Sequence, residues 1–296
     1  MMRLLRCKKK LDVLLSRGTR FSHRIMSTHL ERTESSSRDQ NVFSAEVTKI
    51  NPLSKSVKQL NLKIIDKSFY FKPGQWVDFF IPGLSTVGGF SICSSPKCLQ
   101  QNKQLTLAVK YSTHPPAHWV HTQCKTGDKV QIRVGGDFYL DLSKPYGDQS
   151  REDILLIAGG VGINPLWSMM QYVADTITES PTVSFGRTSL LYSASTNDEL
   201  LFKDAIIDTC NQHPLMDCKF FITSDEITDQ NQILYNNKFT QGYRITKDTL
   251  KMALTQLNTS RVKVFICGPQ PMIESMVATL LELGVDINNI HFEKWW

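Results

Sequence analysis

The spacing of the apolar segments changes near residue 150, and this change constrains the fold more than any other feature of the chain. Between residues 42 and 142 the chain holds six short segments rich in β-branched and aromatic residues. They read NVFSAEVTKI, VKQLNLKII, QWVDFFI, GGFSIC, QLTLAVKY and DKVQIRV, and turns such as Asn-Pro, Pro-Gly and Thr-Gly-Asp lie between them. Short strands at this spacing are typical of an antiparallel barrel or sandwich.

After residue 150, continuous apolar runs alternate with longer segments of helical periodicity. The runs ILLIA, SLLYSA, KFFIT and KVFICG are apolar on both faces, and ELLFKDAIIDTC and PMIESMVATLLELG have the period of helices. Strands of this kind, alternating with helices, form a parallel sheet that is covered on both faces. We therefore predict a β plus α/β protein, in which an antiparallel β-barrel precedes a parallel α/β nucleotide-binding sheet, with the boundary between residues 145 and 152.

Length, composition and charge agree with two folded domains. The chain has 296 residues, whereas single domains have about 100–200. No apolar run approaches the ~20 residues that span a bilayer, so no transmembrane segment is predicted. The net charge of +6 comes from the first 25 residues, which carry +7, whereas the other 271 residues carry −1. A near-neutral body has no electrostatic footprint for nucleic acid, and no nucleic-acid partner is expected.

The first 25 residues have the composition of an organellar targeting segment. Eight arginines and lysines stand against Asp12 alone, among leucines and hydroxyl residues. This is typical of a mitochondrial transit peptide, so we expect a mitochondrial protein. A secretory signal is the weaker alternative, because Asp12 interrupts its apolar region, and an untargeted disordered tail is a third. The polar, serine-rich segment 26–41 is predicted to be a linker.

The seven cysteines are scattered along the chain. An odd and scattered set is typical of reduced thiols rather than of a disulfide framework. No Cys-x-x-Cys occurs, and no His/Cys cluster has the spacing of a zinc or iron–sulfur site. No metal site is therefore predicted.

The segment AGGVGINP lies between a predicted strand and a predicted helix from Pro165 to about Ala174. In a parallel sheet, a crevice opens at the carboxyl ends of the strands. Gly159, Gly160 and Gly162 allow positive φ angles and the close approach of a phosphate, and the helix N-terminus offers unpaired N–H groups. The turn lacks the GxGxxG spacing, so by itself it also fits a tight connection without a ligand.

A second motif lies on a later strand. VFICGPQPMIESMV contains Cys267, Gly268 and Pro269, and Met272 lies at the start of the following helix. Cys267 is predicted at the carboxyl end of its strand, beside the same crevice. Taken alone, a cysteine in such a place is more often a buried small residue than a reactive one.

Together the two motifs resemble the ferredoxin-NADP reductase superfamily of flavoproteins, and within it the match looks most like the oxidoreductase NAD-binding domain-containing proteins. The resemblance covers residues 42–296. The family pattern GGxGIxP is matched within AGGVGINP, and the pattern CGPxxM is matched by CGPQPM. LLYSASTNDELLFKDAI is similar to the family segment between those motifs.

The resemblance implies a six-stranded antiparallel FAD-binding barrel at residues 42–148 and an NAD-binding α/β domain at residues 149–296. It implies that the cofactors meet between the domains, where a hydride passes from the nicotinamide to the flavin and electrons leave to an unidentified acceptor. Phe90 is then the aromatic residue that stacks on the flavin, and Ser91 and Cys267 are the catalytic residues beside the hydride path. The implied cofactor-binding residues are Phe90, Ser91, Ile92, Lys110, Gly159, Gly160, Val161, Gly162, Ile163, Asn164, Pro165, Cys267, Gly268, Pro269 and Met272.

The chain departs from the family in the flavin half. Gly88 stands where the family has an arginine for the flavin phosphates, and Ala117 stands where it has a serine hydroxyl. A guanidinium is a strong bidentate partner of a phosphate, so its loss weakens the expected site. Four basic side chains offer compensation, or else belong only to a strand end and a surface helix: Lys110, His114, His118 and His121.

Two further features concern the nucleotide and the chain end. Where NADPH-using members carry basic residues after the second strand of the nucleotide domain, this chain reads STNDE, which repels a 2′-phosphate and favours NADH. Family members often place a terminal aromatic residue near the flavin; here Trp295 or Trp296 takes this place, or the tail packs on the core.

The sequence therefore predicts a flavin-dependent NADH oxidoreductase. The alternative is a non-catalytic nucleotide-binding or assembly module that no longer holds flavin tightly, for which Gly88 and Ala117 are the reason.

Overall fold

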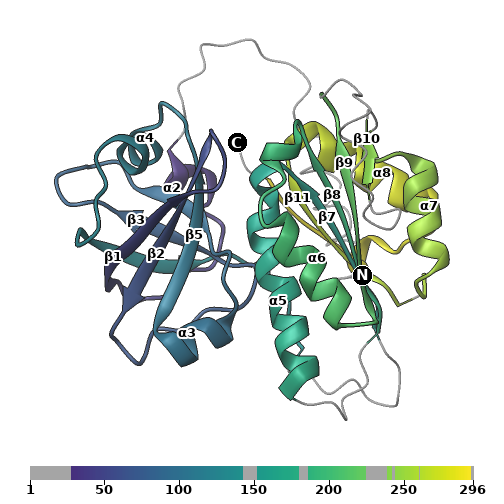
Figure 1. Ribbon diagram of the computed structural model, residues 1–296, viewed down its shortest axis with the longest axis horizontal. Coiled ribbons are helices and arrows are strands. Elements are labelled where there is room, and N and C mark those ends of the chain that lie inside the picture. Colours follow the sequence, from purple (N-terminus) through teal and green to yellow (C-terminus); the bar gives the residue numbers. More distant parts are fainter. Residues whose placement is uncertain are drawn as a thin grey trace.

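The computed structural model of the chain describes residues 28–142, 152–179, 186–224, 239–241, 244–259 and 261–294. Two lobes lie side by side, an antiparallel barrel and a parallel sheet flanked by helices (Figure 1). The predicted targeting segment 1–25 and the predicted domain boundary at residue 148 fall outside the described residues. Within the described ranges, no helix has the length and apolar character needed to cross a membrane.

Six antiparallel strands form the first sheet, as the sequence predicts. They are β1 (Phe43–Pro52), β2 (Val57–Ile64), β3 (Trp76–Phe80), β4 (Gly88–Ser91), β5 (Gln104–Lys110) and β6 (Lys129–Gly135). Their order is β4-β3-β6-β1-β2-β5, and an isolated bridge between Ile92 and Leu107 joins the two edges into a barrel. Two helices connect the strands, α3 (Pro96–Asn102) and α4 (Pro115–Thr122).

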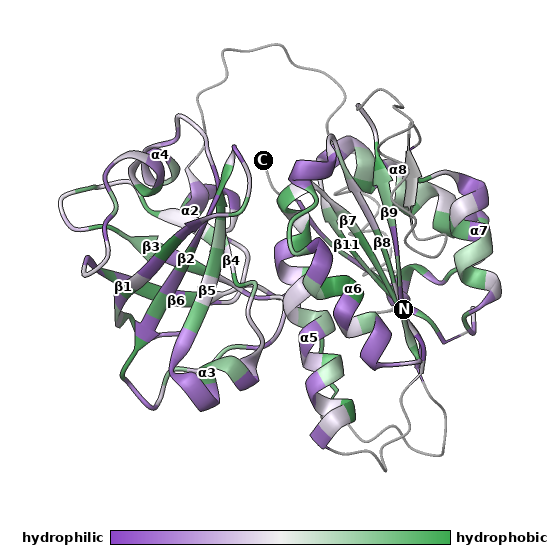
Figure 2. Cartoon of the chain, in the orientation of Figure 1, coloured by the Kyte–Doolittle hydropathy of each residue, from purple (hydrophilic) through white to green (hydrophobic). Residues whose placement is uncertain are grey.

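Alternating side chains build the barrel core. In β6, Val130 and Ile132 are buried, whereas Lys129 and Gln131 are exposed. Successive side chains of a strand point to opposite faces, so this alternation gives the sheet one apolar side. Green and purple bands alternate along the barrel strands for this reason (Figure 2).

In the described part of the second lobe, six parallel strands form a sheet in the order β10-β9-β8-β7-β11-β12. The strands are β7 (Ile154–Gly159), β8 (Thr188–Ala194), β9 (Met216–Ile222), β10 (Phe239–Gln241), β11 (Lys263–Gly268) and β12 (Ile290–Lys294). The helices are α5 (Ile163–Glu179), α6 (Lys203–Gln212), α7 (Lys247–Thr255) and α8 (Gln270–Glu282). Because β8 lies on one side of β7 and β11 on the other, the sheet has a topological switch point at β7, where ligands of such sheets bind.

Both faces of the parallel sheet are buried. Leu156 and Ala158 of β7 belong to the apolar cluster on the side of α5 and α6, and Leu155 and Ile157 belong to the cluster on the side of α7 and α8. Strands buried on both faces read as continuous apolar runs, which is the pattern that predicts this sheet. Helix α5 lies between the sheet and the barrel (Figure 1).

The segment predicted as a linker is part of the barrel domain over its described residues, 28–41. Thr28 and Glu31 form a capping box that begins the short helix α2 (His29–Arg32). Farther along, Arg38 forms an isolated bridge with the last residue of β6. The linker prediction is therefore wrong for these residues.

A buried carboxylate holds this segment on the barrel. Asp78 of β3 is fully buried, and its Oδ1 lies 2.9 Å from His29 Nε2. Its Oδ2 accepts hydrogen bonds from Arg38 Nε at 3.0 Å and from Arg133 Nη2 at 2.6 Å. Burial raises the pKa of Asp78, but the hydrogen bonds from His29, Arg133 and Arg38 outweigh it and hold the pKa below its usual value. The polar residues of the segment thus pair with a buried charge instead of with water.

Hydrogen bonds from side chains of helix α5 connect the second lobe to the barrel. Asn164 Nδ2 donates to the carbonyl oxygen of Ala108 at 2.8 Å, and Ser168 Oγ donates to the carbonyl oxygen of Ser94 at 2.7 Å. Each bond joins a buried side chain of α5 to the main chain of the barrel, so the two lobes meet through polar contacts of defined geometry.

Candidate functional site

The glycine turn and the CGPQPM motif meet at the carboxyl ends of β7 and β11. These strands pair in parallel, with Ala158 opposite Cys267. A Cβ atom on Gly162 would collide with the carbonyl oxygen of Cys267, and one on Gly159 would lie 2.7 Å from Met272 Sδ. The contact of Gly162 is with rigid backbone and leaves room only for glycine, whereas a side chain at Gly159 would require Met272 to shift. The structure therefore brings the two motifs into contact at the carboxyl ends of these strands.

The turn itself is a 3-10 turn, η1 (Gly160–Gly162), that runs directly into α5. Gly160 has a φ of +54°, and a Cβ atom there would meet nothing within 4 Å. Its backbone is thus open to the approach of a ligand. Helix α5 begins at Ile163, earlier than predicted, because η1 continues into it. Pro165 remains in the first helical turn, where its missing N–H costs no helical hydrogen bond.

A cavity of about 320 Å³ lies between the barrel and the glycine turn. Phe90 and Ser91, at the end of β4, line it from the barrel, and Val161 and Asn164 line it from the second lobe. Its volume lies in the range of small-molecule sites, about 300–1,000 Å³. Predicted site residues from both domains therefore share one cavity.

Asn164 carries a buried oxygen without a partner. The residue is 4% exposed, and its Nδ2 donates to the carbonyl oxygen of Ala108 in the barrel. Its Oδ1 accepts no hydrogen bond from any residue that the structure describes. An unsatisfied buried acceptor is costly and uncommon in folded proteins. Because Asn164 lines the cavity, this oxygen is a candidate acceptor for an N–H group of a ligand.

The cavity wall is basic. Among its described residues there is no Asp or Glu, and four bear basic side chains: His29, Arg32, Lys110 and His114. Burial lowers the pKa of His114, and the charges of Arg32 and His29 lower it further. A wall of this composition favours an anionic ligand.

The neighbours of β4 explain the first departure from the family pattern. A Cβ atom on Gly88 would lie 2.8 Å from Pro116 Cβ in α4, so an arginine at this position requires a shift of that helix. Ala117, the second departure, is buried and lines the cavity without offering a hydroxyl.

Two of the four side chains expected to compensate line the cavity, Lys110 and His114. The other two lie elsewhere. His121 Nε2 is 2.9 Å from the carbonyl oxygen of Val109, and His118 is exposed on the surface of α4.

Some predicted site residues lie away from the cavity. Cys267 is fully buried in an apolar cluster, and burial, together with the charge of Glu293, raises the pKa of its thiol well above the usual value. Ile92 is fully buried in the barrel core. Trp295 and Trp296 lie outside the described residues. In the described part of the chain, no group of three or more His, Cys, Asp or Glu side chains is arranged to hold a metal ion.

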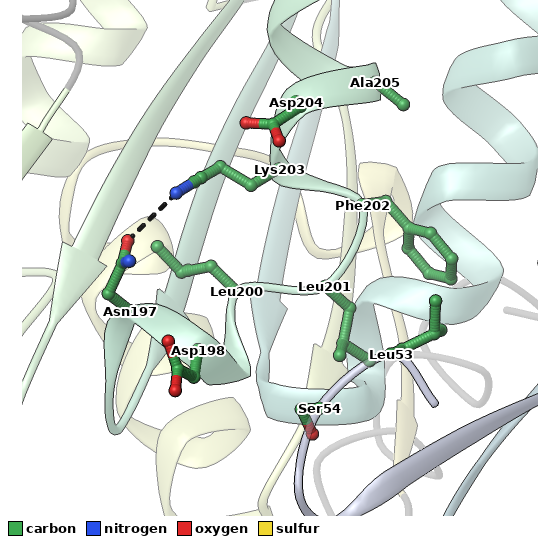
Figure 3. Close-up of a pocket in the computed structure, with 10 residues that line it drawn as sticks. All are labelled: Leu53, Ser54, Asn197, Asp198, Leu200, Leu201, Phe202, Lys203, Asp204 and Ala205. Carbon is green, nitrogen blue, oxygen red and sulfur yellow. Dashed lines mark hydrogen bonds between the residues drawn. The ribbon is translucent and has the colours of Figure 1, made fainter. Parts of the chain in front are cut away.

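A second cavity, of about 430 Å³, lies beyond the carboxyl end of β8 (Figure 3). Its walls come from η2 (Asn197–Glu199), the start of α6 and the turn between β1 and β2. Asp198 and Asp204 line it, and its Lys203 donates to Asn197 Oδ1 at 3.2 Å. The acidic STNDE segment thus forms part of this wall.

Two residues of α2 that reach the first cavity are not predicted from the sequence. His29 and Arg32 line it, although they belong to the segment predicted as a linker. One signal exists, because Thr28 and Glu31 have the Ser/Thr-x-x-Glu spacing of a capping box. A helix of one turn has no apolar periodicity to accompany it, so this spacing does not predict where the helix packs.

The chain shares its fold with solved FAD- and NAD-binding proteins. The chain is similar to the FAD/NAD-binding domain of nitric oxide dioxygenase from Vibrio cholerae, with a TM-score of 0.65 and 20% identity, over 86% of this chain and 98% of that one. It is similar to a ferredoxin NADP⁺ reductase from Neisseria gonorrhoeae with bound FAD and NADP, with a TM-score of 0.66 and 16% identity, over 87% of this chain and 100% of that one. The fold is that of the ferredoxin-NADP reductase-like flavoprotein reductases.

Sequence comparison defines the family. The model of the oxidoreductase NAD-binding domain matches residues 156–278. Oxidoreductase NAD-binding domain-containing protein 1 of Danio rerio is 45% identical over 271 residues, which are 90% of this chain and 97% of that protein. The chain belongs to the family of oxidoreductase NAD-binding domain-containing protein 1. The electron transfer component of toluate 1,2-dioxygenase from Pseudomonas putida is a more distant relative, 24% identical over 86% of this chain and 67% of that protein.

Proposed function

We propose that the chain is an FAD-dependent NADH oxidoreductase that passes electrons to a separate acceptor. The observation that carries this proposal is the cavity that both lobes line, with Phe90 and Ser91 on one side and Val161 and Asn164 on the other. An enzyme of this kind has to bring two cofactors together between two domains, and a shared cavity meets this requirement. The reductase fold and the distant relation to an electron transfer component support it.

The residues of the cavity fit a flavin. The unpartnered Oδ1 of Asn164 suits the N–H group that an isoalloxazine ring carries, and Phe90 offers an aromatic face for stacking. The basic wall suits the phosphates of a dinucleotide. When bound, FAD supplies hydride acceptance and the release of electrons singly or in pairs.

In this proposal, the side chains of the chain bind and orient the two cofactors. Ser91 presents a hydroxyl, which both donates and accepts hydrogen bonds, on the cavity wall beside the expected hydride path. Gly160 keeps the backbone open to the nucleotide. Cys267 lies behind the turn, where its carbonyl oxygen contacts Gly162 and its thiol keeps its proton at neutral pH. We therefore propose Ser91 as the catalytic residue of the pair and Cys267 as a positioning residue.

NADH rather than NADPH is the proposed donor. Asp198 and Asp204 line the second cavity, and their charges oppose a 2′-phosphate. Replacing both with asparagine should narrow the preference for NADH about 10-fold, since losing ~1.4 kcal/mol of repulsion is a factor of 10 in affinity. Titration of the wild type and the D198N/D204N variant with both nucleotides measures this. Equal affinity of the wild type for NADH and NADPH would contradict the preference.

The test of the proposed activity is an absorption spectrum of the purified chain from Ser27 onward, recorded alone, with FAD, and then with anaerobic NADH. We expect an oxidised flavin band at about 450 nm that NADH bleaches. A chain that holds FAD but is bleached by neither NADH nor NADPH is not this oxidoreductase. A chain that acquires no flavin spectrum is instead the non-catalytic nucleotide-binding module, for which Gly88 and Ala117 are the reason.

We also propose that the protein acts in mitochondria, because the leader 1–25 is basic, rich in hydroxyl residues and almost free of acids. The full chain should be recovered in the mitochondrial fraction of cells that express it, and the chain from Ser27 onward should not. Recovery of both in the cytosol would contradict import.

A further inference from the structure

The shared cavity receives a basic side chain from α2. Arg32 lines it beside Lys110 and His114, in a wall whose described residues include no carboxylate. Arg32 is partly buried, and burial lowers the pKa of its guanidinium. A guanidinium nonetheless remains protonated in proteins, because its intrinsic pKa is so high. Arg32 therefore supplies a permanent positive charge at this wall.

The other bases of the wall are weaker candidates for binding an anion. Lys110 Nζ lies 3.8 Å from Glu199 Oε2, and His29 Nε2 lies 2.9 Å from Asp78 Oδ1. The imidazole of His114 is held toward its neutral form by burial and by the neighbouring positive charges. Arg32 also has a partner, since its Nε donates to the carbonyl oxygen of Thr28 at 3.3 Å. Its guanidinium nevertheless has five N–H donors and stays charged at neutral pH, so it can bind an anion as well.

Gly88 and Gly89 of β4 leave the space that α4 and α2 fill. A Cβ atom on Gly88 would lie 2.8 Å from Pro116 in α4, and one on Gly89 would collide with the ring of His29 in α2. With these neighbours in place, β4 has no room for a long side chain at either position. The absence of an arginine at position 88 is thus linked to the packing of α4 and α2 against β4, because these helices occupy the space that side chains at positions 88 and 89 would need.

We propose that Arg32 binds the diphosphate of the flavin dinucleotide and that residues 28–38 are therefore part of the cofactor site. This inference rests on the proposed function, since it takes FAD as the ligand of the cavity. A guanidinium offers two parallel N–H donors that match phosphate oxygens. The unpartnered Oδ1 of Asn164 in the same lining is an independent indication of a ligand. Asp78 positions Arg32 by holding His29 and Arg38 on the barrel.

The experiment compares a ligand with phosphates and a ligand without them. FAD and riboflavin are titrated, by flavin fluorescence, into the chain from Ser27 onward as wild type, Arg32→Gln, Arg32→Lys and the control Arg187→Gln. Arg187 is an exposed arginine just before β8 and does not line the cavity. We expect R32Q to bind FAD about 10-fold to 100-fold more weakly. R32K should keep part of the affinity, and riboflavin binding should change less than about 2-fold in every variant.

Each outcome decides between the proposals. Wild-type binding of FAD with an unchanged affinity in R32Q overturns the role of Arg32 and leaves the proposed function standing. Equal losses for FAD and riboflavin in R32Q also overturn it, because they indicate a structural role. A wild type that binds no FAD removes the proposed function and this inference together.

A second measurement keeps the inference testable if the variants do not fold. Phenylglyoxal modifies accessible arginines, and peptide mass spectrometry of the wild type reports the extent at each one. Saturating FAD should protect Arg32 and leave Arg187 unprotected. Equal modification of Arg32 with and without FAD would contradict the proposal.

Discussion

Two glycines of the turn η1, Gly160 and Gly162, have different surroundings. Gly160 adopts a φ of +54° and faces open space, whereas Gly162 lies directly against the carbonyl group of Cys267. The first keeps the backbone accessible to a ligand, and the second lets the turn pack on β11. The same residue type thus leaves the backbone open at one position and allows close packing at the other.

Replacing each glycine with alanine should separate these functions. Gly162→Ala overpacks a rigid backbone contact and should lower the free energy of unfolding by about 1–3 kcal/mol. Gly160→Ala should cost about 1–2 kcal/mol for the left-handed conformation, and it should weaken NADH binding about 10-fold by narrowing the approach to the turn. Denaturant unfolding and NADH titration of both variants measure the two effects. An unchanged NADH affinity in Gly160→Ala would show that the nucleotide does not approach this backbone.

Among the described helices, α2 is short enough to depend on its surroundings for its order. Isolated helices shorter than ~12–15 residues are marginal in water, and α2 has four residues. His29 packs edge-on against Trp76, with 4.8 Å between ring centroids, and Arg38 lies 5.0 Å from the centre of the same ring. These contacts and the Asp78 carboxylate join the segment to the barrel as one folded unit.

Acid should weaken the attachment of residues 28–41 to the barrel. The pKa of Asp78 is lower in the folded protein than in the unfolded chain, so its contribution to stability is present above the unfolded-state pKa of about 4 and is lost as the pH falls through the lower folded-state value. At pH 7, Asp78→Asn should lower the free energy of unfolding by about 3–5 kcal/mol, as expected for breaking a buried ion pair. The difference between wild type and variant should shrink below about pH 4.

Denaturant unfolding of both proteins between pH 7 and about pH 3 measures this difference. Asp208→Asn, at an exposed position of α6, is the control, and its effect should be small throughout. A difference for Asp78→Asn that stays constant over the whole range would mean that the carboxylate is not the group that titrates.

For the whole molecule, the relative position of the two lobes is the property that the proposed chemistry requires. Besides the bonds of α5, Glu199 of η2 accepts hydrogen bonds from Ser54 Oγ at 2.9 Å and Ser56 Oγ at 2.8 Å, and it lies 3.8 Å from Lys110 Nζ. One carboxylate of the second lobe thus gathers three side chains of the barrel beside both cavities.

Glu199→Ala should slow the reduction of bound flavin by NADH while leaving FAD affinity near the wild-type value. A displacement of about 1 Å between reacting groups can cost about 100-fold in rate, so a decrease of up to that size is expected. Anaerobic stopped-flow reduction at saturating NADH measures the rate. Glu282→Ala removes an exposed ion pair with Lys247 far from the barrel and is the matched control. Equal rates in the two variants would show that Glu199 does not align the lobes.

Much of the fold could be predicted because its signals are local. The alternation of side chains predicts the barrel strands, the continuous apolar runs predict the parallel sheet, and the strand, glycine turn and helix of AGGVGINP predict a crevice. The carboxyl end of β11 follows by the same reasoning, so Cys267 and Met272 could be placed beside the turn. This reasoning left open whether Cys267 is a buried small residue or a reactive one, and the structure shows it fully buried. It did not predict that Ile92 faces the barrel core.

The sequence by itself thus determined the two lobes, their order, and the meeting of two motifs at the strand ends, because period and turn chemistry act over a few neighbouring residues. Only the tertiary structure decided that the polar segment 28–41 belongs to the barrel and that Arg32 reaches the cavity. The physical reason is that a buried carboxylate at Asp78 needs compensating charges, and two of its partners, His29 and Arg38, come from a distant part of the chain. A short stretch of sequence cannot show this requirement, because Asp78 and its partners are far apart in the chain.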